Sequence, residues 1–238
     1  RANNPTAADG GGGADTAEEI KQNALGTFQT QLRAVTQDDY LIRALSLPSR
    51  YGTISKAYTS VEKLSNLNVG EVVPSLGLYI LSQNSNGNLT YASMALKQNL
   101  KTYLGYHKMT SDAILIKDAY YINIKVGFDI TLSPSYNAQD VITRCVNALK
   151  DYFNIDKWQI NQPIIMRDLY VLLDRIEGVQ TVKNIEISNF VGTNLGYSPY
   201  AYDISGATKN GVVYPSLDPM IFEVKYPSAD IQGRVVSL

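Results

Sequence analysis

An alternation of apolar and polar residues over residues 113–132 is the clearest pattern in the chain. Its apolar positions are Tyr120, Ile122, Ile124, Val126, Phe128, Ile130 and Leu132, and they alternate with Tyr121, Asn123, Lys125, Gly127, Asp129 and Thr131. This period of two predicts a strand with one face against a core. The length of the stretch further predicts a bend near Lys117 and Asp118, or a strand that serves two sheets in turn.

Helical spacing of apolar residues, with capping signals before it, predicts helices elsewhere. Thr36 precedes a short apolar run with Asp38 and Asp39 in the first turn, and Asn137 precedes a longer one. In the longer run, Cys145 shares the apolar face and is expected to be a core residue. The predicted helices cover residues 16–30, 37–47, 90–106, 138–153 and 163–177.

Shorter strand patterns surround these helices. They predict strands at Thr53–Val61, Leu76–Leu81, Val179–Ser188, Met220–Lys225 and Gly233–Ser237. The sequence NSNGNL, Asn84 to Leu89, is typical of a tight turn because Asn-Gly readily adopts the backbone angles that such turns need.

Together these elements predict an α+β fold, with two small helix-on-sheet domains in tandem and a β-rich, loop-rich C-terminal segment. The expected organisation is a flexible linker and first helix, two α+β domains, and a Tyr-rich loop followed by terminal β strands. The corresponding ranges are 1–36, 37–118, 119–189 and 190–238.

Composition narrows the function. The 238 residues are 45% hydrophobic, with 21 basic and 22 acidic residues and a net charge of -1. That balance argues against nucleic acid and against an anionic membrane as partners, because both need clustered positive charge. No apolar run reaches the roughly 18 to 20 residues that cross a bilayer. The polar start is not typical of a signal peptide. Since it lacks Met, we expect a fragment or a processed product.

The residue inventory offers little for catalysis. His107 and Cys145 are the sole histidine and cysteine, which excludes a zinc site with two histidines and leaves only a Cys-His dyad as a conceivable nucleophile. Gly10–Gly13 has neither a preceding strand nor a following GKS or GKT, so a linker is favoured over a phosphate loop. Asp38 and Asp39 suit a helix N-terminus. We therefore expect no enzyme activity, cofactor, metal or small-molecule substrate.

Tyrosine is unusually frequent, with 17 residues against five phenylalanines. After Phe190 the chain loses its periodicity and becomes rich in Gly, Asn and Ser. The tyrosines of this segment are Tyr197, Tyr200, Tyr202 and Tyr214. They are candidates for a protein–protein interface, where Tyr is enriched. Half-buried strand positions and carbohydrate binding remain alternatives for these rings.

A motif near the N-terminus adds a family hypothesis. It consists of Gly12, Gly13, Ala14 and Asp15 with Glu18 and Glu19, then Arg33, Ala34, Val35 and Thr36 with Asp39 and Tyr40. At this spacing the two halves resemble the signature of the baseplate J-like family of contractile phage tails. The Tyr-rich insertion further resembles the wedge subunit of T-even phages that forms an inner dimeric ring, and the chain would match its C-terminal part.

The resemblance implies a structural role in the virion, in the tail baseplate, with assembly in the host cytoplasm. The implied partners are a second copy of the chain and other baseplate wedge proteins, and the contacts would have to accommodate baseplate rearrangement on host attachment. Two alternatives stay open. One is the equivalent protein of a tail-like bacteriocin or contractile secretion system, and the other is a carbohydrate-binding module of a tail.

Overall fold

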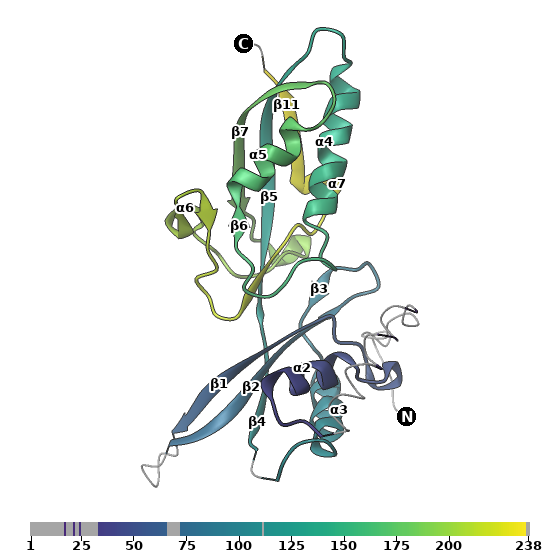
Figure 1. Ribbon diagram of the computed structural model, residues 1–238, viewed down its shortest axis with the longest axis vertical. Helices are drawn as coiled ribbons and strands as arrows, with labels where there is room; N and C mark the ends of the chain where they lie inside the picture. The colour runs from purple at the N-terminus through teal and green to yellow at the C-terminus, as the bar shows by residue number, and fades with distance from the viewer. Residues whose placement is uncertain are drawn as a thin grey trace. The chain divides into compact units, whose positions relative to one another are not determined.

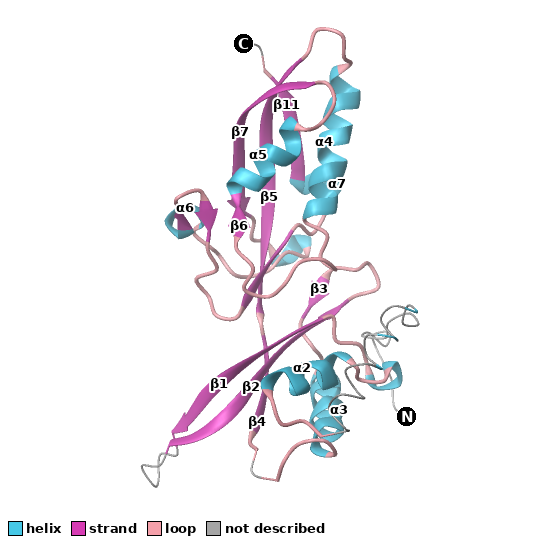
Figure 2. Cartoon of the chain, in the orientation of Figure 1, coloured by secondary structure: helices cyan, strands magenta, loops and turns pink. Residues whose placement is uncertain are grey.

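The computed structural model describes residues 33–65, 72–110 and 112–236, together with the single positions 17, 21 and 24. Gly10–Gly13 and the predicted cap at Thr16 lie outside the described residues. The chain divides into two compact units, Arg1–Ala119 and Tyr120–Leu238, and each is described by itself. Both units combine helices with a sheet (Figures 1 and 2), which confirms the predicted α+β class.

The first unit is built on a four-stranded sheet around β2. Strand β1 and the short strand β3 run antiparallel to β2, whereas β4 runs parallel to it. The bounds are β1 Lys56–Ser65, β2 Val72–Gln83, β3 Leu89–Thr90 and β4 Ile114–Asp118. The predicted turn lies between β2 and β3, where Gly87 has a φ of 79° that favours glycine.

Two helices complete the core of the first unit. They are α2 (Gln37–Leu45) and α3 (Met94–Gly105), with a 3-10 turn η1 (Ser49–Tyr51) after α2. A hydrophobic cluster joins them to the sheet, and its fully or nearly buried members include Tyr40, Ala44, Leu78, Ile80, Leu96, Leu100 and Leu104. The helix predicted from Thr90 begins four residues later, because Thr90 pairs with β2 and Ser93 caps the helix.

The second unit is built on β5 (Tyr120–Leu132). Strand β7 (Val179–Asn189) pairs with it antiparallel, and β10 (Met220–Glu223) and β11 (Ile231–Val235) pair with it parallel. Because β7 and β11 both pair with residues 126–130, they lie on opposite edges of β5. The C-terminal strands that we expected in a separate segment, 190–238, thus belong to the β5 sheet.

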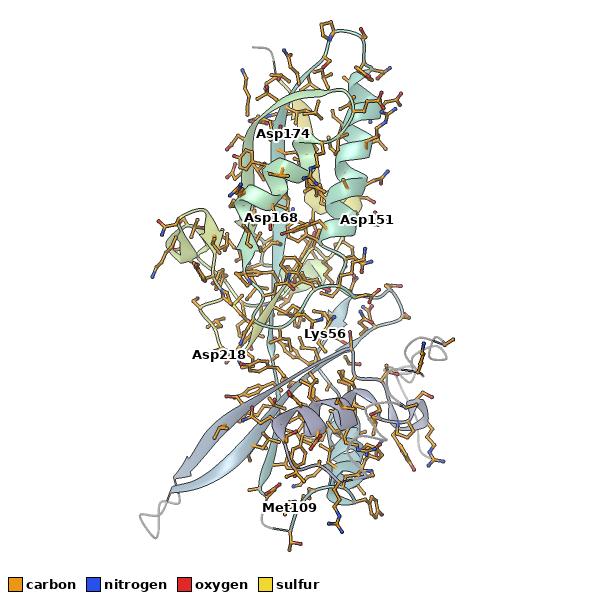
Figure 3. All side chains as sticks on the ribbon, viewed as in Figure 1. Lys56, Met109, Asp151, Asp168, Asp174 and Asp218 are labelled. Carbon is orange, nitrogen blue, oxygen red and sulfur yellow. The ribbon has the colours of Figure 1, made fainter. Side chains whose placement is uncertain are left out.

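Helices cover one face of this sheet (Figure 1). Helix α4 (Ala138–Tyr152) packs against β11, and α5 (Met166–Asp174) packs against β7. Figure 3 places Asp151 on α4, and Asp168 and Asp174 on α5. The smaller elements are β6 Ile164–Ile165, η2 Thr193–Leu195, α6 Ile204–Ala207, β8 Thr208–Lys209, β9 Val212–Val213 and α7 Pro227–Asp230. Of these, β6, β8 and β9 form a small sheet.

The long alternation of residues 113–132 is interrupted once, at Ala119. The part before it is β4 of the first sheet, and the part after it is β5 of the second. The prediction that this stretch serves two sheets in turn is therefore confirmed. Within β5 the alternation of burial holds from Ile124 to Ile130. It fails at both ends, where Tyr121, Asn123 and Thr131 are buried and Tyr120 is exposed.

Candidate functional site

The four candidate interface tyrosines fall into two classes. Tyr197 and Tyr202 are buried, each with 8% of its surface exposed, whereas Tyr200 and Tyr214 are 37% and 48% exposed. Both buried rings point into their own unit and expose little surface to a partner. The interface prediction for the four tyrosines stays a prediction, and Tyr200 and Tyr214 are its more accessible candidates.

Asn123 of β5 attaches the start of the Tyr-rich segment to the sheet. Its fully buried side chain donates to Oε2 of Glu223 at 2.7 Å and accepts from the backbone N–H of Ser198 at 2.6 Å. Its carbonyl accepts from the N–H of Phe190 and from the side-chain amide of Asn189, both at 3.0 Å. A buried amide with all these partners fixes the backbone that it touches.

Asp230 holds the same segment through a second set of hydrogen bonds. The carboxylate is buried and accepts from the Tyr197 hydroxyl at 2.7 Å and from the backbone N–H of Tyr226 at 2.8 Å. Lys125 Nζ lies 3.8 Å from it and 3.5 Å from the centre of the Phe190 ring. Burial, and then the bond to Asp230, raise the pKa of Tyr197. Tyr197 is therefore a neutral, structural hydroxyl at every physiological pH.

Tyr202 attaches the later part of the segment. Its hydroxyl donates to the carbonyl of Tyr214 at 2.5 Å and accepts from the N–H of Ser216 at 3.0 Å. Its ring meets that of Phe222 edge-on, with 5.6 Å between centroids. The segment lacks long helices and strands, but side-chain hydrogen bonds hold it against the β5 sheet.

Tyr200 forms an exposed aromatic pair with Tyr120. The rings meet edge-on at 5.0 Å between centroids, and 36% of Tyr120 is exposed. The sequence pattern placed Tyr120 on the buried face and Tyr121 on the open one, whereas the structure buries Tyr121 and leaves Tyr120 exposed. The periodic pattern therefore did not identify Tyr120 as a surface residue. Tyr120 is the first residue of β5, and its ring lies beside Tyr200 of the Tyr-rich segment.

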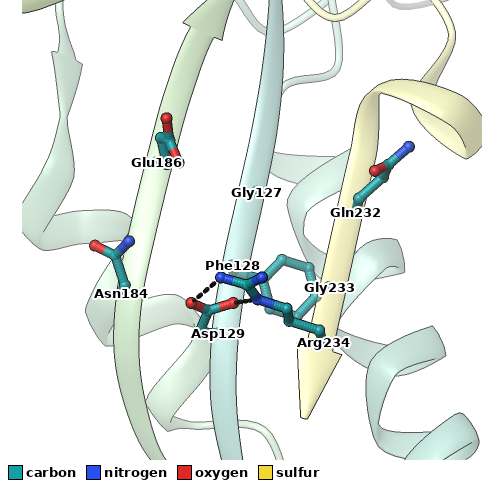
Figure 4. Close-up of a pocket in the computed structure, with 8 residues that line it drawn as sticks. All are labelled: Gly127, Phe128, Asp129, Asn184, Glu186, Gln232, Gly233 and Arg234. Carbon is teal, nitrogen blue, oxygen red and sulfur yellow. Dashed lines mark hydrogen bonds and ion pairs between the residues drawn. The ribbon is translucent and has the colours of Figure 1, made fainter. Parts of the chain in front are cut away.

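The helix-free face of the β5 sheet carries a shallow polar groove of about 290 Å³ (Figure 4). Gly127 forms its floor, and the side chains around it are Asp129, Asn184, Glu186, Gln232 and Arg234. Arg234 holds Asp129 through two hydrogen bonds, at 2.5 Å and 3.0 Å. These bonds lower the pKa of Asp129, so the pair stays ionised.

The first unit carries its own polar cluster on the sheet. Glu62 of β1 reaches across β2, accepts from the Tyr79 hydroxyl, and pairs with Lys117 of β4 at 2.6 Å. A Cβ at Gly77 would lie 2.8 Å from Oε1 of Glu62, so glycine leaves the path open. The bonds from Lys117 and Tyr79 lower the pKa of Glu62. The cluster ties three strands together.

Cys145 and His107, the two residues considered for catalysis, make packing contacts within the fold. Cys145 is fully buried in α4, and burial raises the pKa of its thiol to about 11, which confirms a core residue and makes it a poor nucleophile. His107 meets the ring of Tyr103 edge-on at 4.9 Å. Among the residues that the structure describes, no group of three His, Cys, Asp or Glu side chains could hold a metal. None of the described helices has the length and apolarity to cross a membrane.

The acidic pair near the N-terminus is a helix cap. Asp39 N–H donates to the Thr36 hydroxyl at 3.2 Å, and the Asp39 carboxylate accepts from the N–H groups of Thr36 and Val35 at 2.8 Å and 3.0 Å. Burial alone would raise the pKa of Asp39, but these backbone hydrogen bonds outweigh it and the pKa is lowered. The predicted capping role of this stretch is confirmed.

Comparison with known proteins finds a similar fold among solved structures. No family model and no curated protein matches the chain. Among solved structures, a chain in the cryo-EM structure of the anti-feeding prophage baseplate matches with a TM-score of 0.54 and 15% identity. The chain shares its fold with that baseplate chain. The match covers 88% of this chain and 42% of the other, so this chain spans less than half the length of its relative.

Proposed function

We propose that the chain is a structural subunit of the baseplate of a contractile tail. The observation that carries the proposal is the shared fold, because the match to a chain of a prophage baseplate extends over 88% of the residues and thus includes both units. The N-terminal motif supports it independently, and its second half is Arg33, Ala34, Val35 and Thr36 with Asp39 and Tyr40. Within such a baseplate, the motif favours a member of the J-like family.

The finer proposal is a wedge subunit of the inner ring, similar to that of T-even phages, that binds a second copy of itself and other wedge proteins. Such contacts would rearrange on host attachment. The exposed aromatic residues of the second unit support a role in contacts: Tyr120, Tyr200 and Tyr214 combine an apolar ring with a polar hydroxyl on the surface.

An equivalent subunit of a phage-tail-like particle is the second candidate. The structural relative comes from an anti-feeding prophage, and a shared fold at 15% identity fits either kind of particle. A carbohydrate-binding module is less well supported, because Tyr197 and Tyr202 are buried and their rings are not available for stacking on a sugar.

Reconstitution with the other baseplate proteins of the same particle tests the proposal. Analytical ultracentrifugation of the chain, alone and with each of those proteins, should give dimers or mixed complexes. We expect Tyr200→Ser and Tyr214→Ser to weaken at least one of these complexes. Tyr136→Ser is the matched control, because Tyr136 is equally exposed but lies outside the Tyr-rich segment. A chain that stays monomeric at high concentration and binds none of those proteins would refute the proposal.

A further inference from the structure

The edge strands β7 and β11 differ in how their outward backbone groups are bonded. The carbonyl of Ile130 accepts from Val236 at 2.9 Å, so Ile130 and its even-numbered neighbours in β5 direct their backbone groups toward β11. Ile185 pairs with one of them, Phe128, and therefore directs its own N–H away from β5. That outward N–H donates to the Tyr170 hydroxyl at 3.1 Å.

Helix α5 covers the β7 edge with a second side chain. The N–H of Val182 donates to Oδ1 of Asp174 at 3.3 Å, and Figure 3 shows Asp174 on this helix. Two outward amides of β7 are thus satisfied from within the unit. Covering an edge in this way prevents another strand from pairing with it.

Among the residues that the structure describes, no side chain bonds to the outward amides of β11. Since the N–H of Val236 points toward β5, those of Val235 and Gly233 point away from it. Ile231 donates to the carbonyl of Pro227, but among the described residues β11 pairs with no strand other than β5. Val235 is also 39% exposed. The edge therefore presents the outward N–H and C=O groups of Gly233 and Val235 as a template for a further strand.

We propose that this edge of β11 receives an extended segment of another protein of the assembly, which adds to the sheet as a strand. The inference rests on the proposed function, since it supplies one of the contacts that a baseplate subunit needs. Strand addition takes its affinity from main-chain hydrogen bonds and its selectivity from alternate side chains.

The neighbours of the edge define the chemistry of the segment. On the helix-free face, Arg234 uses Nε and Nη2 for Asp129, and its remaining guanidinium donors suit an Asp, Glu or Asn of the added strand. On the helical face, an ideal Cβ at Gly233 would lie 2.1 Å from the Phe128 ring, so that ring already fills the space above the glycine. The matching residue of the partner is expected to be small and apolar.

The position of α4 favours a single strand over a second copy of the chain. In Figure 1, α4 lies toward the β11 end of the sheet, and it packs against β11 on the face that the helices cover. Pairing two β11 strands about a two-fold axis would bring both α4 helices to the same side of the joint sheet and beside the same edge. A lone extended segment brings no helix with it.

Hydrogen exchange of the wild-type chain, with and without peptides, is the direct test. The probes are overlapping synthetic peptides of about 15 residues from the other structural proteins of the same particle. We expect at least one peptide to bind and to slow exchange at the amides of Gly233 and Val235. Absence of any such peptide, or binding without protection of these amides, would overturn the inference.

Two adjacent valines provide matched variants. Val235→Pro removes an outward N–H, and proline is tolerated at an edge when its nitrogen faces outward; we expect at least about tenfold weaker peptide binding with little change in Tm. Val236→Pro removes the inward bond to Ile130, and we expect a lower Tm with unchanged binding by the folded protein. Equal peptide affinity of wild type and Val235→Pro would overturn the inference.

Intact partner proteins separate this inference from the proposed function. If they bind wild type and Val235→Pro equally, the strand site is wrong while the baseplate proposal stands. If they do not bind the wild-type chain at all, the baseplate proposal fails, and this inference fails with it.

Discussion

Gly233→Ala should destabilise the second unit through one steric conflict. A Cβ at position 233 would lie 2.1 Å from Cζ, 2.3 Å from Cε2 and 2.8 Å from Cε1 of Phe128. Carbon atoms pack at about 3.5–4.0 Å, so the ring must move by more than about 1 Å. Phe128 is only 2% exposed, and the surrounding core resists the movement. Overpacking of this kind costs about 1–3 kcal/mol.

Gly127→Ala is the matched control in the neighbouring strand. There the nearest atom to an added Cβ is the Glu186 carbonyl oxygen at 3.9 Å, an ordinary contact. Replacing a strand glycine with alanine gains about 0.5–1 kcal/mol when space allows. We therefore expect Gly127→Ala to be neutral or stabilising, and Gly233→Ala to be less stable than it by about 1–4 kcal/mol.

Trp158 supplies a specific readout. It is the sole tryptophan and is buried in the second unit, so its fluorescence follows that unit during urea denaturation. Phe128→Leu should relieve part of the conflict, giving a double variant that is at least about 1 kcal/mol more stable than additivity predicts. Equal midpoints for the Gly233→Ala and Gly127→Ala proteins, or strict additivity with Phe128→Leu, would refute the steric argument.

Three further predictions concern polar contacts. Tyr197→Phe leaves the buried Asp230 with one bond fewer and should cost about 1.5–3 kcal/mol by the same fluorescence assay; an unchanged midpoint would contradict the anchoring role. Because the pKa of Glu62 is lowered in the fold, its stabilisation is present above its ordinary pKa and is lost as pH falls through the folded value. Glu62→Gln should therefore make the stability of the first unit depend less on pH on the acid side, as measured by hydrogen exchange in β1 and β2. Thr36→Ala should cost about 1 kcal/mol through the lost cap, seen as faster exchange in α2.

Features encoded within a few residues could be predicted from the sequence. The caps at Thr36 and Asn137 and the central alternation of β5, from Ile124 to Ile130, depend on neighbours along the chain, and the structure has them where the pattern placed them. The environments of Tyr197 and Tyr202 could not be predicted in this way. Their hydroxyls donate to Asp230 and to the Tyr214 carbonyl, which lie 33 and 12 residues further along the chain. No local sequence pattern predicts partners at such distances.

The sequence also did not predict that β10 and β11 pair with β5, for the same reason. Asn123 and Glu223 are 100 residues apart in sequence, and β10 reaches β5 only after the whole Tyr-rich segment has intervened. A periodic strand pattern identifies a strand but not the neighbour beside which it lies. Asn123 stands at one of the regular polar positions of the alternation, so the sequence carried no signal that its amide is buried and bonded to Glu223 and Ser198.

The tyrosine excess acquires a more specific meaning from these contacts. The hydroxyls of Tyr197 and Tyr202 form hydrogen bonds within the unit. These bonds hold the backbone that carries the exposed rings. The N–H of Tyr200 donates to the Ser198 hydroxyl at 3.3 Å, and Ser198 is itself bonded to Asn123. A surface that is ordered before binding loses less conformational entropy on association. An interface that uses Tyr200 therefore depends on the buried tyrosines beside it, and weakening the Tyr197–Asp230 bond should reduce partner binding even though neither side chain touches the partner.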